Sequence, residues 1–170
     1  MEVKDYICIE LEHLKRVTSR VLDGLSQSEM AWRPGAGCNP IGLILFHIMK
    51  FEDSVIQSRI QGQQTLWESE KWYERLKLPE SESGARYTEE QVAAFPVPEP
   101  SELVAYHDAV RARTIEYVKS LNANDFDKII NMQPFGDISI GSLLALVLGH
   151  QSQHMGEISY LRGLQRGMNK

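Results

Sequence analysis

The chain has 170 residues, of which 42% are hydrophobic and 24% are charged, and this composition predicts a single globular domain over residues 1–170. The net charge of -5 argues against proteins that bind nucleic acids or anionic membrane surfaces, because both classes need a basic face. The N-terminal residues lack the apolar core of a signal peptide, and no run of about 18 apolar residues occurs, so we expect a cytoplasmic protein without a transmembrane helix.

Four segments place apolar residues at the spacing of an amphipathic helix. The second opens with Asn39 and Pro40, an N-cap residue followed by a proline at the first helical position. The third starts at Pro100, and the fourth starts near Ser139 or Ser142. In chain order, the expected helices cover about residues 4–25, 39–62, 100–121 and 139–167.

A long connection, about residues 62–98, joins the second and third helices. It contains one candidate short helix within residues 67–78 and another at 87–95, where Thr88 is the expected N-cap. Residues 95–100 hold three alternating prolines, which forbid a helix, and residues 133–140 are a candidate extended piece. The simplest architecture is therefore all-α, a four-helix bundle with a long crossover between its second and third helices.

Two histidines of the fourth helix carry the strongest chemical signal. His150 and His154 are four residues apart within an apolar stripe, so their imidazoles lie on one helical face, about 6 Å apart along the axis. Burying two adjacent imidazoles is costly unless their nitrogens are satisfied, and one metal ion would satisfy both. The zinc-protease signature is absent, because Gln151 stands where that motif has glutamate.

A third histidine, His47, lies in the apolar stripe of the second helix. If both stripes face the same core, the set of His47, His150 and His154 has the ligand number of a catalytic zinc site. His107 lies on the stripe of the third helix and is a fourth ligand, a supporting residue, a general base or a simple interior histidine, with the last favoured. The plain alternative for all of them is a histidine-containing core without metal.

Acidic residues near these histidines are not expected to be ligands. Glu52 and Asp53 lie off the face of His47 and are predicted to be solvated. Glu157 follows His154 by three residues and is either a surface glutamate or a hydrogen-bond acceptor for that histidine. The two cysteines, Cys8 and Cys38, form no metal-binding spacing; their number allows one disulfide, but two buried, reduced thiols are expected.

Two stretches of the chain resemble the DinB-like (YfiT-like metalloenzyme) superfamily. The first is residues 25–53, in which Trp32-Arg33-Pro34 and residues 39–42 lead to His47, and the second is residues 150–164, which hold the two later histidines. The crossover also looks like that of uncharacterised members, so the resemblance covers nearly the whole chain.

This resemblance implies a four-helix bundle with one divalent transition metal, zinc or nickel, bound by His47, His150 and His154. It also implies a homodimer and a small-molecule substrate, in some relatives a low-molecular-weight thiol. The leading hypothesis is therefore a metal-dependent thiol S-transferase or hydrolase. The alternative is a non-catalytic dimeric binding module with a structural metal site.

Overall fold

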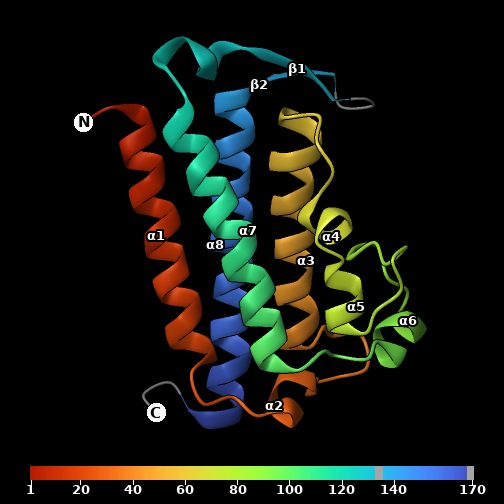
Figure 1. Cartoon of the computed structure of the whole chain (residues 1–170). Helices are drawn as coiled ribbons and strands as arrows, with labels where there is room; N and C mark the ends of the chain where they lie inside the picture. The colour runs from red at the N-terminus through yellow and green to blue at the C-terminus, as the bar shows by residue number, and fades with distance from the viewer. Residues whose placement is uncertain (133–135, 168–170) are drawn as a thin grey trace.

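Four long helices lie side by side in the computed structural model, which describes residues 1–132 and 136–167 (Figure 1). The second of them continues without a break into a π-helical segment, η1 (Ser54–Ile60). This arrangement confirms the predicted all-α bundle with a long crossover between its second and third long helices. The four are α1 (Val3–Leu22), α3 (Ile41–Asp53), α7 (Pro100–Ser120) and α8 (Ile140–Arg166).

Most helix ends fall close to the predicted positions. Pro100 is in the first turn of α7, and the Ser139 hydroxyl caps α8 by accepting a hydrogen bond from the Ser142 backbone N–H. The start of α3 differs from the prediction, because Pro40 is the N-cap and the first helical residue is Ile41. α1 ends at Leu22, just before Gly24 adopts a φ of +68°.

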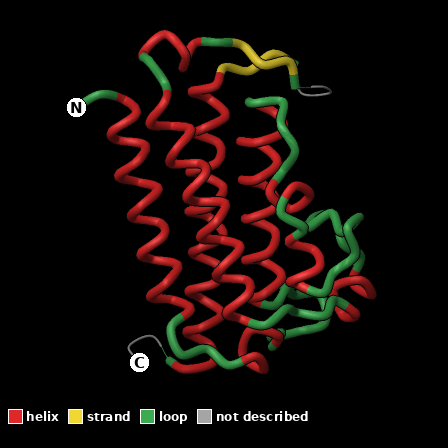
Figure 2. The backbone as a smooth tube through the Cα atoms, viewed as in Figure 1, coloured by secondary structure: helices red, strands yellow, loops and turns green. Residues whose placement is uncertain are grey.

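The crossover contains three short helices on the α3 side of the bundle, with α4 and α5 nearer to α3 and α6 at the outer edge (Figures 1 and 2). They are α4 (Leu66–Ser69), α5 (Trp72–Leu76) and α6 (Glu89–Ala94). Thr88 caps α6 as predicted, and the Gln91 side chain accepts a hydrogen bond from the Thr88 backbone N–H in return. Residues 95–99 are not helical, as the prolines require.

One short helix, α2 (Gln27–Ala31), was not predicted. Its signal was present in the sequence, because Ser26 and Glu29 form a capping box in which each side chain bonds the other's backbone N–H. At the opposite end of the bundle, the 3-10 helix η2 (Ala123–Asp127) leads into an antiparallel hairpin of β1 (Ile129–Asn131) and β2 (Asp137–Ser139). The hairpin contains part of the predicted extended piece, whose residues 133–135 lie outside the described residues.

Glu52 and Asp53 are both buried, so the prediction that they are solvated was wrong. Glu52 accepts a hydrogen bond of 2.9 Å from Arg111 and a second from the Gln151 side chain. Arg111 also donates to the Leu11 backbone carbonyl. This polar cluster lies between all four long helices, because each helix contributes one of its members.

Asp53 connects α3 to the crossover. Its carboxylate accepts hydrogen bonds from the backbone N–H groups of Leu66 and Trp67, which open α4, and from the Tyr106 hydroxyl. The free N–H groups at a helix start need such an acceptor. The prediction failed because the partners of a buried carboxylate come from distant parts of the chain.

The two cysteines are less buried than the sequence predicts. Both Cys8 and Cys38 are free thiols, but Cys8 is partly buried and Cys38 is exposed, so the expected burial was wrong. None of the described helices is long and apolar enough to cross a membrane.

Candidate metal centre

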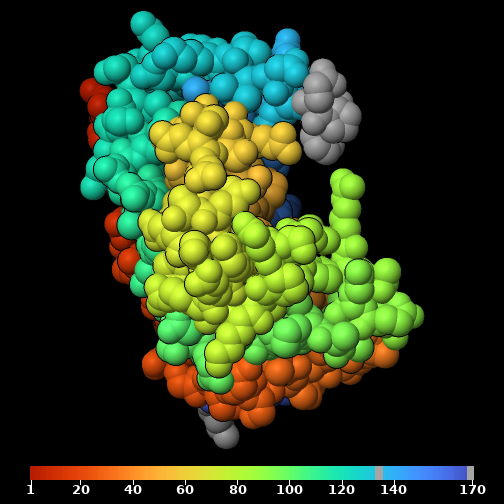
Figure 3. All heavy atoms as spheres, turned by 45° about the vertical axis from the view of Figure 1, so that its right-hand side comes forward, coloured from red at the N-terminus to blue at the C-terminus, as the bar shows by residue number. Residues whose placement is uncertain are grey.

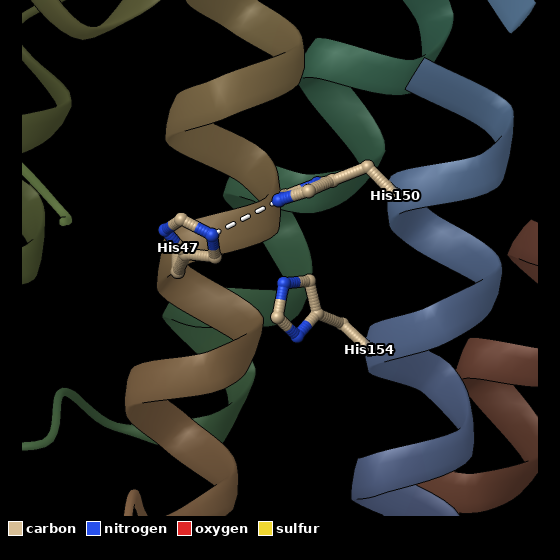
Figure 4. Close-up of side chains that lie close together, drawn as sticks. All are labelled: His47, His150 and His154. Atoms are coloured by element: carbon tan, nitrogen blue, oxygen red, sulfur yellow. Dashed lines mark hydrogen bonds between the residues drawn. The ribbon is translucent and has the colours of Figure 1, made fainter. Parts of the chain in front are cut away.

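His47, His150 and His154 come together between α3 and α8, as Figure 4 shows. Each of the three offers one ring nitrogen, and these nitrogens all lie within 4.8 Å of one another. The two residues of α8 share a face because they are one turn apart, while His47 reaches them from the facing helix. All three side chains are partly buried.

The spacing within the cluster suits a single ion. The Nε2 atoms of His47 and His150 are 3.0 Å apart. The ring centroid of His154 lies 4.5 Å from that of His150 and 5.0 Å from that of His47. Zinc–nitrogen bonds of about 2.0–2.1 Å place two ligands of one ion about 3–3.5 Å apart. Small side-chain rotations would therefore bring all three nitrogens to bonding distance.

Hydrogen bonds fix which nitrogen of two histidines is free. His47 Nδ1 lies 2.7 Å from the Gly84 backbone carbonyl oxygen, and His154 Nδ1 lies 2.8 Å from Glu157 Oε2. Both partners only accept, so each Nδ1 carries the proton and donates it. The Nε2 atom of each ring then carries a lone pair, and that of His47 accepts a hydrogen bond from His150 Nε2, a contact that a metal ion would replace. Such hydrogen bonds to Nδ1 are the support that metal-binding histidines ordinarily receive.

Gly84 holds its carbonyl against His47 through a backbone that suits glycine. Its φ is +73°, in the left-handed region. A Cβ atom at this position would lie 3.0 Å from both Cβ and Cγ of Lys50 and 3.4 Å from the Phe46 ring. Conformation and close packing on α3 therefore both require glycine here.

His150 has a more apolar setting than the other two. Its ring centroid lies 4.2 Å from that of Phe51, and its Nδ1 atom is buried without a hydrogen-bond partner among the described residues. Burial, with a smaller effect of His154 and His47, lowers the pKa of His150 to about 4. Burial also lowers the pKa of His47. Both rings are therefore neutral at pH 7, which is the form that binds metals.

The remaining histidines lie outside this cluster. His107 is buried in α7, with its Nδ1 atom 3.3 Å from Asp108, and is not among the three clustered residues. His13 is exposed on α1. Glu157 accepts a hydrogen bond from His154, so the supporting role that the sequence left open agrees with its position.

A pocket of about 240 Å³ opens beside the histidines. Its walls come from the N-terminal part of α3, from the crossover and from α8. Figure 3 shows the crossover, yellow to green, spread over the face that is turned toward the viewer. The sequence identified the two histidines as candidates here but not the other lining residues, whose contribution depends on how the crossover folds back. The lining residues are Asn39, Leu43, His47, Gly84, Ala85, Arg86, Tyr87 and His154.

Trp67 and Trp72 of the crossover are buried in the core and do not line the pocket. They pack with Tyr106, whose ring centroid lies 5.9 Å from that of Trp67 and 5.2 Å from that of Trp72. Both tryptophans therefore serve packing.

The structure is thus a four-helix bundle with a long crossover, in which three histidines converge between two of the long helices. A family model of the DinB superfamily matches residues 10–158. The chain therefore belongs to the DinB superfamily. No curated protein matches the sequence significantly.

Two solved structures share the fold. A conserved protein from Enterococcus faecalis is 22% identical and superposes with a TM-score of 0.84, over 96% of this chain and 97% of that one. YfiT from Bacillus subtilis is 16% identical with a TM-score of 0.65, over 98% of this chain and 90% of its own. YfiT is described as a probable metal-dependent hydrolase with an unusual four-helix bundle topology.

Proposed function

We propose that this chain is a metal-dependent enzyme in which His47, His150 and His154 hold one divalent transition metal, zinc or nickel. The observation that carries the proposal is the convergence of three ring nitrogens within 4.8 Å at the wall of a pocket. Three histidines leave a coordination position for a further ligand, as in catalytic zinc sites. The description of YfiT as a probable metal-dependent hydrolase supports the same class of reaction.

The protein residues have separable roles in this proposal. The Gly84 carbonyl and the Glu157 carboxylate orient His47 and His154, and the apolar contact with Phe51 keeps His150 neutral. A divalent metal bound there would act as a Lewis acid and would lower the pKa of a coordinated water or thiol. Because His47 and His154 also line the pocket, a substrate in the pocket would lie next to the metal position.

The nucleophile is either water or a low-molecular-weight thiol. The description of YfiT as a probable metal-dependent hydrolase favours water. The pocket lining favours a thiol, because none of its residues is an aspartate or glutamate that could act as a separate general base. Addition of a thiol to an electrophilic double bond or strained ring needs only loss of the thiol proton, which the adduct takes up again, whereas hydrolysis usually needs a base or acid in addition.

A structural metal in a non-catalytic module is the competing proposal. It requires a metal position that is closed to ligands from solvent. The pocket beside His47 and His154 argues against closure. Titration of the cobalt(II)-substituted protein with a small thiol or with imidazole separates the two, because a changed visible spectrum reports an open coordination position.

The first test of the enzyme proposal is metal analysis of protein expressed in metal-supplemented medium. We expect one zinc or nickel ion per chain. The loaded protein is then assayed with activated esters and amides for hydrolysis, and with cellular thiols plus reactive electrophiles for transfer. Protein without stoichiometric metal would overturn the proposal, and so would a cobalt spectrum that no exogenous ligand changes.

A further inference from the structure

We propose that the pocket binds a substrate that carries a carboxylate, and that Arg86 is the residue that recognises it. This proposal rests on the proposed function, because the reacting end of the substrate is taken to lie at the metal. Among the described residues, the pocket wall contains one guanidinium group, that of Arg86, and no carboxylate. With neutral imidazoles and a divalent metal, the charge of the pocket would be strongly positive.

The Arg86 side chain is available to a ligand. It is exposed, and its guanidinium makes no hydrogen bond or ion pair within residues 1–132 and 136–167. Other arginines near the crossover are engaged, such as Arg75, which forms an ion pair with Glu102 at 2.8 Å and stacks on Trp72. A planar guanidinium binds carboxylates through two parallel hydrogen bonds, so an unpaired one at a pocket wall favours that chemistry.

Two carboxylates close to the pocket residues in sequence, Glu82 and Glu157, have hydrogen-bond partners of their own. Glu82 accepts a 2.7 Å hydrogen bond from the Tyr87 hydroxyl, and Glu157 is bonded to His154. Neither lines the pocket. An incoming carboxylate would therefore meet Arg86 without first displacing an internal partner.

The backbone of Arg86 is held in a conformation that costs free energy. Its φ is +60°, in the left-handed region that disfavours residues with a Cβ. The segment around it is fixed by the Gly84 carbonyl on His47 and by the Ser83 hydroxyl, which donates to the Ala85 carbonyl at 2.9 Å. Strained residues in well-supported segments cluster at ligand sites. Here the strain places a cation in the same wall as two histidines.

The size of the pocket limits the substrate to a compact molecule. A volume of about 240 Å³ is below the usual range for drug-sized ligands. The pocket suits a short acyl chain with a reacting group at one end and a carboxylate at the other. We use the monohydroxamates of succinic and glutaric acid as probes, because a hydroxamate binds the metal and leaves the carboxylate free.

Each probe has a neutral mate in which a methyl group replaces the carboxylate, namely butyrohydroxamate and valerohydroxamate. Affinity is measured by calorimetry and by the visible spectrum of the cobalt(II)-loaded protein. In the wild type, we expect at least one carboxylate-bearing probe to bind about tenfold more tightly than its mate, the size of one charge-assisted hydrogen-bonded pair. The preference should shrink with added salt.

The variants assign the preference to Arg86. In Arg86→Gln the two kinds of probe should bind with about equal affinity. Arg86→Lys should retain part of the preference, since lysine keeps the charge but not the planar geometry that makes two parallel hydrogen bonds. Arg59→Gln is the matched control, because it removes the same charge from an exposed position outside the pocket and should keep the full preference.

The outcomes separate this proposal from the proposed function. Equal binding of charged and neutral hydroxamates to the wild type would overturn the carboxylate proposal and leave the open metal site intact. A preference that survives in Arg86→Gln would overturn the role of Arg86. If neither kind of hydroxamate binds to metal-loaded protein, the metal position is closed and both proposals fail.

Discussion

His47 and Gly84 are 37 residues apart in the sequence, yet a 2.7 Å hydrogen bond joins the imidazole Nδ1 of the first to the backbone carbonyl of the second. This bond connects α3, which carries His47, to the crossover that forms part of the pocket wall. It sets the tautomer of His47 and places Arg86 two residues further on. The geometry of the site and the position of the crossover therefore depend on each other.

Gly84→Ala should disturb both the geometry of the histidine cluster and the position of the crossover. The new Cβ atom would press on Lys50 and Phe46 in a backbone conformation that disfavours alanine, so we expect destabilisation of about 2–3 kcal/mol. Displacement of the carbonyl should also weaken metal binding by about 10–100-fold, as for other losses of a supporting hydrogen bond. Chemical unfolding and calorimetric metal titration measure the two effects.

Gly62→Ala is the control for this substitution. Gly62 has a similar φ of +66°, but a Cβ atom there would have no neighbour within 4 Å. It should cost about 1–2 kcal/mol from the backbone alone and leave metal affinity unchanged. Equal metal affinities in the two alanine variants would show that the Gly84 carbonyl does not support the site.

Replacing any of the three clustered histidines by alanine should abolish stoichiometric metal binding while the helical fold is retained. The fold persists because each side chain is only partly buried and the apolar core lies elsewhere. Elemental analysis and far-ultraviolet circular dichroism check the two parts. Added zinc or nickel should raise the melting temperature of the wild type and of the exposed-site control His13→Ala, but not that of the three variants.

Arg111→Met should destabilise the protein by about 3–5 kcal/mol, because it leaves the buried Glu52 carboxylate without its countercharge. The double variant Glu52→Gln with Arg111→Met removes both charges and should recover a large part of that loss. Denaturant unfolding of the two variants and the wild type provides the comparison. A double variant as unstable as Arg111→Met would mean that packing, rather than the unpaired charge, causes the loss.

Glu29 predicts a pH dependence at the C-terminal end of α8. Its hydrogen bonds with Arg166, and then with Ser26, lower its pKa to about 2 from an ordinary value of 4.5. A carboxyl whose pKa is lower in the folded protein stabilises it above pH 4.5 and loses this contribution as the pH falls toward 2. The melting temperature of Glu29→Gln should therefore be below that of the wild type at pH 7 and converge with it near pH 2.

Glu12→Gln is the control for this titration, since Glu12 is exposed and makes no ion pair in the part of the chain described here. Its melting temperature should follow that of the wild type across the whole pH range. A gap between Glu29→Gln and the wild type that stays constant down to pH 2 would contradict the role of the ionised carboxylate.

The sequence predicted the four long helices and the pairing of His150 with His154, because these depend on local periodicity. A spacing of four residues puts two side chains on one helical face whatever the rest of the chain does. Local capping likewise predicted Thr88 at the start of α6, and the same signal at Ser26 and Glu29 would have predicted α2. Such signals act within one turn of helix, so the sequence displays them directly.

Only the tertiary structure determines which distant residues contact each helical face. Glu52 and Asp53 are buried because Arg111, Tyr106 and the start of α4 arrive from distant segments to satisfy them. The Gly84 carbonyl and Arg86 join the histidines for the same reason, through the return of the crossover to α3. Helical periodicity gives the direction of a side chain, but hydrogen-bond partners and pocket walls depend on contacts between residues far apart in the chain.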